Sequence, residues 1–485
     1  MDHSQQIGGG KGHSRNKSGA RSSRPRSSTK GPLDADEAPP LSPQVAARLS
    51  SSRQASPRPS SSLRRSPVGS PARPSTTSSS SHAATTMMTK DFSYLLKPEI
   101  YHQLSPHAVP APFRNSPRQP APEAPIPELL AGGHFRAAAI AAVQALTGSG
   151  SPGAAAVNPA DHARIFQLLY TRLACLCLAD ATALAAQEAR ALEDMGSAFY
   201  YADAASGAPQ HHLAPWELRV LGVRLQAIGF EDPRRAVTGY YDLAREARAG
   251  AREAARAHDH SAAELWKARL ADLGVRVAGA LIEMDDPVAA AEHLTTLDRD
   301  EDEKRRRAAG GGRDVAGGHR GKLAVSRALV WLHLGDVGAA RRCVAGGRAG
   351  SETAEKVVGA LADMADGEYE NALGKWRALR VEMEESGIWD EMVGVNLAVC
   401  LLYVGRMEEA SHPSITLLSF SRGREILEGL VDAGLASHTL LFNLTTMYEL
   451  ATDRAKGLKM RLAERVAELE PSPHGWEKTN ADFKL

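Results

Sequence analysis

The amino-acid sequence predicts an all-α protein of repeated helix pairs that follows a long disordered N-terminal tail. Residues 1–90 are dominated by Ser, Arg, Pro and Gly, whereas the chain from residue 126 onward is rich in Ala and Leu. In that second region no alternation of apolar and polar residues lasts long enough for a sheet. Small residues also recur there at constant distances from turn residues, which is typical of tandem helix pairs.

The tail, residues 1–90, has almost no aromatic residues and cannot bury enough apolar surface to offset the chain entropy lost on folding. It contains 14 Lys and Arg and 4 Asp and Glu, which leaves 44 basic and 53 acidic residues for the rest of the chain. We therefore expect a disordered basic tail beside an acidic body. Such a tail contacts anionic membrane surfaces or serves as a solvated spacer.

Four Ser-Pro pairs lie in this tail, at Ser42, Ser56, Ser66 and Ser70. They are candidate phosphorylation sites for proline-directed kinases, because phosphates there would cancel much of the positive charge. Ser-Pro pairs also arise by chance in a segment rich in both residues, and this alternative stays open.

Residues 91–125 form a Pro-rich linker with a short apolar segment. The segment is too short, and too often interrupted by Pro, to build a core of its own. We expect it to dock on the helical body or on a partner, with an ordinary linker as the alternative. Its apolar residues are Phe92, Tyr94, Leu95, Leu96, Ile100 and Tyr101.

Residues 126–470 are predicted to form the helical-repeat body, and residues 471–485 a C-terminal tail. Gly-rich or Asp-Pro positions predict breaks between helices. The polar stretch 298–321, in which EDEKRRR precedes several glycines, is expected to be a flexible loop. The predicted breaks are 148–153, 205–210, 231–233, 285–287 and 308–321.

The spacing of small residues is typical of tetratricopeptide (TPR) repeats, in which two antiparallel helices occupy about 34 residues. Such a unit needs small residues where its helices cross and a Gly or Asp at the turn between them. Six successive segments match this pattern, although each match alone is weak. The residues expected to pack within and between the units are Ala278, Ala290, Ala328, Trp331, Gly335, Ala340, Ala360, Gly367, Tyr369, Ala372, Asn396, Ala398, Gly405, Ala410, Asn443, Leu444 and Tyr448.

The sixth unit is interrupted after Ala410 by SHPSITLLSFSRG, which contains a Pro and lacks a helical pattern. Omitting residues 411–423 would restore a normal second helix. We therefore expect an inserted loop at 411–423, or a stretch retained from a non-coding part of the gene.

The C-terminal half resembles the TRAPP (trafficking protein particle) complex subunit twelve family. The resemblance rests on NLAVCLLYVGRMEEA, then ILEGLV, then LLFNLTTMYEL, and it is most specific at residues 441–450. Earlier pieces, including FRAAAIAAVQAL and PWELRVLGVRLQAIGF, occur in the same order as in that family. The resemblance covers about residues 126–470, whereas the interruption at 411–423 departs from the family pattern.

The resemblance implies a non-catalytic scaffold subunit of a TRAPP vesicle-tethering complex. Such complexes act in ER–Golgi transport and activate a Rab GTPase through their small core subunits. The implied partners are other TRAPP subunits, and the implied location is cytoplasmic, peripheral at ER–Golgi intermediate and Golgi membranes. Neither a small-molecule substrate nor nucleic acid is expected.

The sequence offers no convincing catalytic, cofactor or metal site. Residues 310–322 lack the first Gly and the final Ser or Thr of a phosphate-binding loop. His211-His212 and His258-Asp259-His260 lack the helical spacing of zinc ligands. The four cysteines lie in apolar, helix-like contexts and are expected to be reduced and buried: Cys175, Cys177, Cys343 and Cys400.

The chain contains no apolar run near the ~20 residues of a membrane-spanning helix, and its first residues lack the apolar core of a secretory signal. A soluble protein without a signal is therefore expected, and the sequon at Asn443 is expected to be unmodified. Asn443 and Tyr448 are expected to lock neighbouring helix pairs together, with a partner-binding surface as the alternative.

Two other classes of binding protein fit the sequence less well. A chaperone adaptor would grip a peptide carboxylate with Lys and Asn, but the corresponding positions are apolar in two units (Val325, Leu329, Val395 and Val399). An RNA-binding helical repeat would need a basic face, whereas the repeat body is acidic overall.

Overall fold

The structure is a computed structural model. It describes residues 90–485 apart from 151–152, 154, 203–210, 309–316, 346–349, 386, 388–389 and 409–412. All of these residues belong to the compact unit Thr85–Leu485. The four Ser-Pro sites, the predicted disordered tail and Ala410 lie outside the described residues.

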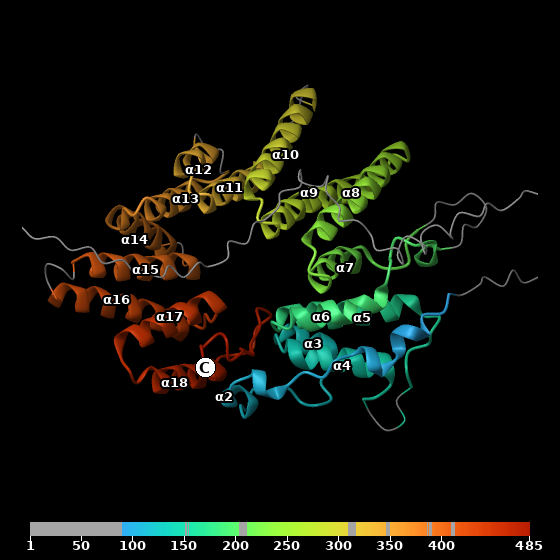
Figure 1. Cartoon of the computed structure of the whole chain (residues 1–485), viewed down its shortest axis with the longest axis horizontal. Coiled ribbons are helices and arrows are strands. Elements are labelled where there is room, and N and C mark those ends of the chain that lie inside the picture. The colour runs from blue at the N-terminus through green and yellow to red at the C-terminus, as the bar shows by residue number, and fades with distance from the viewer. Residues whose placement is uncertain are drawn as a thin grey trace, which may run out of the picture. The chain divides into compact units, whose positions relative to one another are not determined.

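Within the described ranges the chain is all-α, as predicted, with one isolated β-bridge between Tyr201 and His212. Each helix from α3 to α18 packs against the next helix in the sequence (Figure 1). The helices are α2 (Ala111–Arg114), α3 (Ile126–Ala131), α4 (Phe135–Thr147), α5 (His162–Leu178), α6 (Thr182–Ala189), α7 (Trp216–Gly229), α8 (Pro233–Arg256), α9 (His260–Glu283), α10 (Pro287–Ala308), α11 (Gly317–His333), α12 (Val337–Val344), α13 (Glu352–Ala365), α14 (Tyr369–Glu385), α15 (Glu391–Glu408), α16 (Pro413–Asp432), α17 (His438–Ala451) and α18 (Ala455–Glu468).

One turn recurs between the two helices of six successive pairs. Its central residue has a positive φ, and the next residue donates its N–H to the carbonyl five residues earlier at 2.8–3.0 Å. This arrangement satisfies carbonyl groups that the end of a helix leaves without partners. The central residues are Gly133, Asp180, Glu231, Asp285, Gly335 and Gly367.

A buried alanine lies five residues after each of these central residues, with at most 1% of its surface exposed. A methyl side chain lets the two helix backbones approach closely, which larger side chains would prevent. In three of the turns an Asp side chain also caps the second helix; Asp336, for example, accepts a hydrogen bond from Ala339 N at 2.7 Å. The alanines are Ala138, Ala185, Ala236, Ala290, Ala340 and Ala372.

The distance along the chain between successive turns is not uniform. The turns lie about 50 residues apart as far as Gly335, and about 32 residues separate Gly335 from Gly367. Long helices account for part of the difference, since α8 and α9 have 24 residues each. The observed architecture is therefore a series of helix pairs of variable length.

Most of the predicted packing residues lie at helix–helix contacts. Ala278, Ala328, Ala360 and Ala398 are at most 3% exposed on α9, α11, α13 and α15. Trp331 is half-buried and packs against two neighbouring core clusters. The Tyr369 ring stacks on Tyr403 with 4.4 Å between the ring centres. Asn396 instead donates to Met392 O in its own helix at 2.8 Å.

Three expectations about helix ends were wrong. Gly405 lies buried within α15 and not at a turn. Residues 413–423 belong to α16, because Pro413 stands at the first helical position, which Pro tolerates. Residues 298–308 belong to α10, since Glu, Lys and Arg, which are frequent there, have high helix propensity.

The segment 90–105 packs on the start of the helical array. Phe92 and Leu95 are fully buried in a core cluster with residues of α4 to α7. The Phe92 ring lies 5.0 Å from the ring of Phe166 on α5. The Tyr94 and Tyr200 hydroxyls share a hydrogen bond of 2.8 Å.

A buried ion pair holds this segment in place. Arg172 on α5 donates to both carboxylate oxygens of Glu188 on α6, at 2.9 and 2.6 Å. The same guanidinium donates to His102 O at 2.7 Å and to Ala139 O at 3.3 Å. Glu188 in turn accepts the His102 N–H at 2.8 Å. The Arg172 and Glu188 side chains are 2% and 0% exposed, so the pair is shielded from water.

Removing one partner of this pair should be far more damaging than removing both. Arg172→Met should lower the free energy of unfolding by about 3–5 kcal/mol, because Glu188 would keep a buried charge without a partner. Arg172→Met/Glu188→Leu should lower it by less than Arg172→Met alone. Urea unfolding followed by circular dichroism checks this. A loss of stability in the double variant that equals the summed losses of Arg172→Met and Glu188→Leu would contradict the expectation.

The central residue of the recurrent turn has a left-handed backbone conformation. A substitution at a glycine with free space around it measures the cost of that conformation alone. Gly335 has φ +83° and nothing within 4 Å of an added Cβ. Gly335→Ala should therefore lower stability by about 1 kcal/mol through backbone strain alone.

Gly374 is the matched control for this substitution. It lies within α14, has no positive φ and also has nothing within 4 Å of an added Cβ. Gly374→Ala should raise stability by about 0.5–1 kcal/mol. Thermal unfolding of both variants should show shifts of opposite sign; shifts of the same sign would show that the strain at Gly335 is unimportant.

Candidate functional site

The histidine and cysteine motifs do not converge on a reactive centre. Among the described residues, no group of three or more His, Cys, Asp or Glu side chains is placed to hold a metal ion. Asp259 caps α9 by accepting from Ala262 N at 2.9 Å, and the His212 ring bonds Met195 O at 2.9 Å. Residues 317–322 form the start of α11, and residues 309–316 lie beyond the described residues. His211 is exposed, and its carbonyl accepts the Ala202 N–H at 2.9 Å.

The four cysteines are free thiols, and Cys175, Cys343 and Cys400 are buried. Burial raises the pKa of Cys175 and of Cys400 to about 11. Cys177 is half-buried, and desolvation raises the pKa of its thiol as well. The thiols of Cys175, Cys177 and Cys400 are therefore protonated and poorly nucleophilic near neutral pH.

Helix α17, which contains residues 441–450, packs through Leu444 and Tyr448, which are 0% and 3% exposed. The Tyr448 hydroxyl donates to Glu428 Oε1 of α16 at 2.9 Å, which joins the two helices. Burial, followed by this carboxylate, raises the pKa of Tyr448. The neighbouring Thr445 is fully buried and donates to Phe442 O at 3.0 Å.

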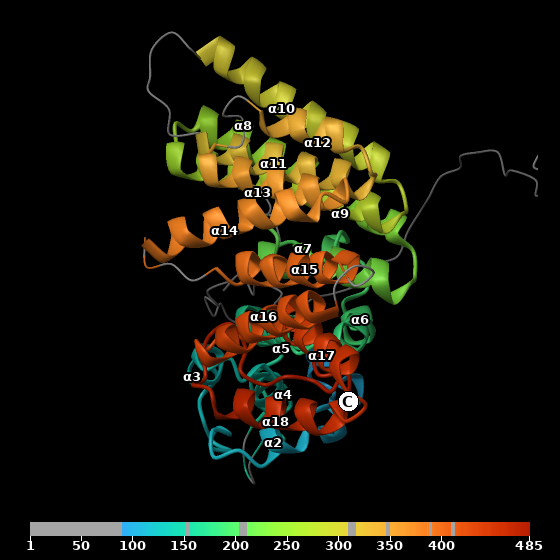
Figure 2. The same cartoon turned by 90° about the vertical axis from the view of Figure 1, so that its left-hand side faces the viewer.

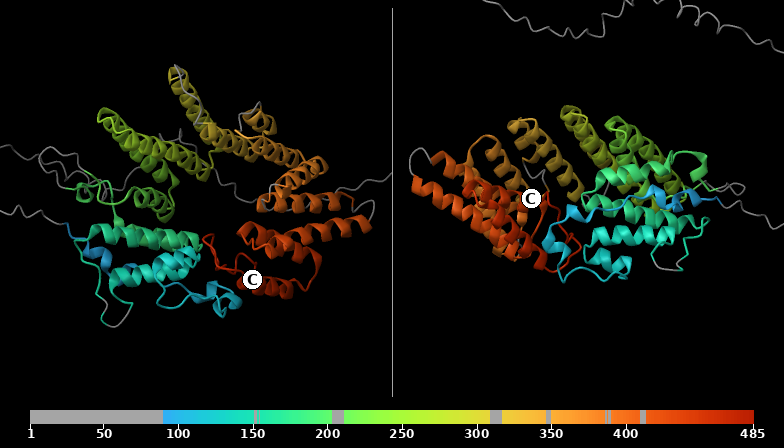
Figure 3. Two further views of the ribbon diagram at one scale, coloured as in Figure 1. Left: turned by 180° about the vertical axis from the view of Figure 1, so that it is seen from behind. Right: turned by 60° about the horizontal axis from the view of Figure 1, so that its bottom comes forward.

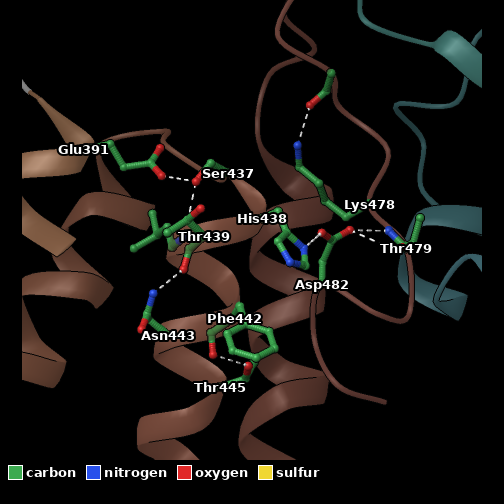
Figure 4. Close-up of polar contacts among 12 residues, drawn as sticks. Glu391, Ser437, His438, Thr439, Phe442, Asn443, Thr445, Lys478, Thr479 and Asp482 are labelled. Carbon is green, nitrogen blue, oxygen red and sulfur yellow. Dashed lines mark hydrogen bonds and ion pairs between the residues drawn. The ribbon is translucent and has the colours of Figure 1, made fainter. Parts of the chain in front are cut away.

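Asn443 makes its hydrogen bond within its own helix. Its side chain is half-buried and donates to Thr439 O in the same helix at 2.8 Å (Figure 4). It therefore does not lock neighbouring helix pairs together through a hydrogen bond. Phe442, beside it, is 43% exposed, and the Lys484 ammonium lies 3.9 Å from the centre of its ring.

The C-terminal segment, residues 470–485, connects the last helix pair to the first. Trp476 N donates to Gly133 O at 3.2 Å in the turn between α3 and α4. The Trp476 ring packs edge-on against Phe113 and His134, with 5.3 Å between ring centres in each case. Asn480 N donates to Ala108 O at 2.9 Å. The segment thus lies beside both α2 and α18 (Figure 3).

Polar contacts support this junction on both sides. Asp482 Oδ1 lies 2.7 Å from His438 Nδ1 at the start of α17, and its other oxygen accepts from Thr479 N at 2.6 Å (Figure 4). Arg136 of α4 lies 2.7 Å from Glu477 Oε1. Burial raises the pKa of Glu477, and the charge of Arg136 offsets only part of this rise.

Further charged groups in the junction are also desolvated. Burial lowers the pKa of Lys478, although Asp482 and Glu391 oppose the shift. Burial also lowers the pKa of His134 beside Trp476. Among the described residues, His438 contacts Asp482 and the Phe442 ring, and these contacts hold the C-terminal segment against α17.

Sequence reasoning missed this junction. Trp476 and Phe483 are 3% and 0% exposed, yet they stand in a segment expected to be a tail. Val109 and Phe113, at 3% and 0%, belong to the same core cluster. Two aromatic residues within eight positions of an otherwise polar segment were the one available signal.

The surface of the array carries apolar side chains outside the junction. Leu265, Val275 and Ile282 are 52%, 40% and 36% exposed on α9, and Leu329 is 46% exposed on α11. A groove of about 820 Å³ lies between α9, α11 and the start of α13, with Val275 and Lys322 in its lining. A second groove of about 620 Å³ lies between α14, α15 and α16.

No protein-family model matches this chain, and no curated protein or solved structure matches it. Among the described residues, no helix is both long enough and apolar enough to span a membrane.

The junction predicts that one aromatic side chain holds both ends of the array. Trp476→Ala should lower the free energy of unfolding by about 3–5 kcal/mol, because it leaves a cavity beside Phe113 and His134. Hydrogen exchange should accelerate at the amides of Trp476 and Asn480, which bond to Gly133 and Ala108. Leu450→Ala, at a side chain that is 48% exposed, is the control and should leave these amides protected. Unchanged protection in Trp476→Ala would contradict the proposed anchoring.

Proposed function

We propose that this protein is a non-catalytic scaffold of TPR type that holds other proteins together in a TRAPP vesicle-tethering complex. In that role it supports Rab GTPase activation by the core subunits during ER–Golgi transport. The proposal joins a binding role, which the geometry supports, to a partner identity, which the sequence resemblance supports.

The recurrent turn with its buried alanine is the observation that carries the scaffold role. Six helix pairs share it, and stacked pairs of this kind present extended surfaces to other proteins. The variable spacing between turns differs from a uniform 34-residue period. We therefore interpret the array as TPR-like, with lengthened pairs between Gly133 and Gly335.

The partner identity rests on the family resemblance of residues 126–470, and above all on residues 441–450. In the structure these residues form most of α17, whose buried side chains join α16 and α17. A membrane contact through the basic tail belongs to the same proposal, because anionic lipid attracts Lys and Arg.

The chaperone-adaptor alternative fits the structure less well. At the positions where a carboxylate clamp needs Lys and Asn, Val395 is 5% exposed and Val399 is half-buried. Leu329 is exposed but apolar. None of these side chains can donate a hydrogen bond to a peptide carboxylate.

A pull-down of the full-length tagged protein from its native cells tests the proposal. Mass spectrometry should identify the small TRAPP core subunits in stoichiometric amounts at moderate salt. An unrelated tagged protein of similar size is the control bait. Recovery of chaperones or ribonucleoproteins without any TRAPP subunit would refute the partner identity and leave the scaffold role in place.

A further inference from the structure

The groove between α14, α15 and α16 combines an apolar floor with exposed cations. Its floor consists of Val393, Leu397 and Leu401 of α15, which are 2%, 3% and 5% exposed. Val381 of α14, at 54% exposure, and the half-buried Ile426 of α16 form its sides. The three helices lie next to one another in the array (Figure 2).

The carboxylates that line this groove already have partners. Glu384 lies 2.6 Å from Arg380 Nε, and Asp390 accepts the Met392 N–H at 2.8 Å. Glu425 accepts from Ser421 Oγ at 3.2 Å. Glu384 is therefore paired with a cation and Asp390 caps the start of α15, whereas Glu425 keeps its charge beside a neutral donor.

Two arginines that line the groove have no such partners among the described residues. Arg377 on α14 and Arg422 on α16 are exposed, and neither makes a hydrogen bond or ion pair with another residue that the structure describes. A guanidinium presents a planar set of N–H donors that matches a carboxylate. The groove therefore offers two open sites for negative charge on either side of apolar surface.

We propose that this groove binds a segment of a partner protein in which apolar side chains are flanked by Asp or Glu. The apolar side chains contact Val381, Ile426 and the α15 floor, while the carboxylates pair with Arg377 and Arg422. A basic segment would place like charges together, which disfavours binding. The inference rests on the proposed scaffold role and does not depend on the TRAPP identity.

A peptide selection tests the proposed chemistry directly. The full-length protein is screened against a display library of random 12-residue peptides, and the affinity of enriched peptides is measured by fluorescence anisotropy. Enriched peptides that bind this groove should carry Leu, Ile or Phe together with Asp or Glu. Arg377→Glu/Arg422→Glu should weaken their binding at least tenfold, and Val381→Asp should also weaken it.

Charge reversal on α8 provides the matched control. Arg248 and Arg252 are likewise exposed and make no ion pair with a described residue, but they lie outside the groove. Arg248→Glu/Arg252→Glu should change the affinity by less than twofold. Peptides in which Lys replaces each Asp and Glu should bind Arg377→Glu/Arg422→Glu at least tenfold more tightly than they bind the wild type.

Three results would overturn the proposal. Enriched peptides could lack acidic residues, or they could bind the wild type and Arg377→Glu/Arg422→Glu equally well. Sedimentation could instead show a wild-type dimer that the double substitution dissociates, which would assign the groove to a second copy of the chain. Recovery of TRAPP subunits in the pull-down is a separate readout, so failure of either proposal can be recognised by itself.

Discussion

The buried ion pair between Arg172 and Glu188 is the interaction on which the start of the helical array depends. Its two charges lie out of water, and they are tolerated because all three guanidinium nitrogens and both carboxylate oxygens are hydrogen-bonded. Those neighbours belong to α4 and to the segment before it, through Ala139 O and His102. An array of stacked helix pairs leaves one face of its first pair uncovered. Here Phe92 and Leu95 cover that face, and the ion pair holds the covering segment in position.

The parts of this fold that sequence could predict are those set by near neighbours in the chain. A turn residue and a buried alanine five positions later lie within one local motif, so their recurrence is visible in the sequence. The helix at 413–423 was missed because a Pro suggested a break, whereas Pro413 begins the helix. Helical structure at 298–308 was missed because its high charge resembled that of a loop.

The junction at Trp476 could not be predicted for a different physical reason. Its contacts with Phe113 and Gly133 span more than three hundred residues, and no spacing rule connects positions so far apart. The groove between α14 and α16 could not be predicted either, because its two arginines, Arg377 and Arg422, lie on different helices. Repeat architecture thus explains how neighbouring pairs stack, while the junction and the groove arise from side chains that the stacking brings together.

The contact between Phe113 and the C-terminal segment has a consequence for the order in which this chain folds during its synthesis. Phe113 and Val109 leave the ribosome long before Trp476 and Phe483, which bury them. At ~5–20 residues per second, the interval between Phe113 and Phe483 is roughly 20–70 s. Throughout that interval Val109 and Phe113 lack the C-terminal side chains that bury them in the finished fold. The apolar surface of α2 is therefore buried only when the chain is nearly complete.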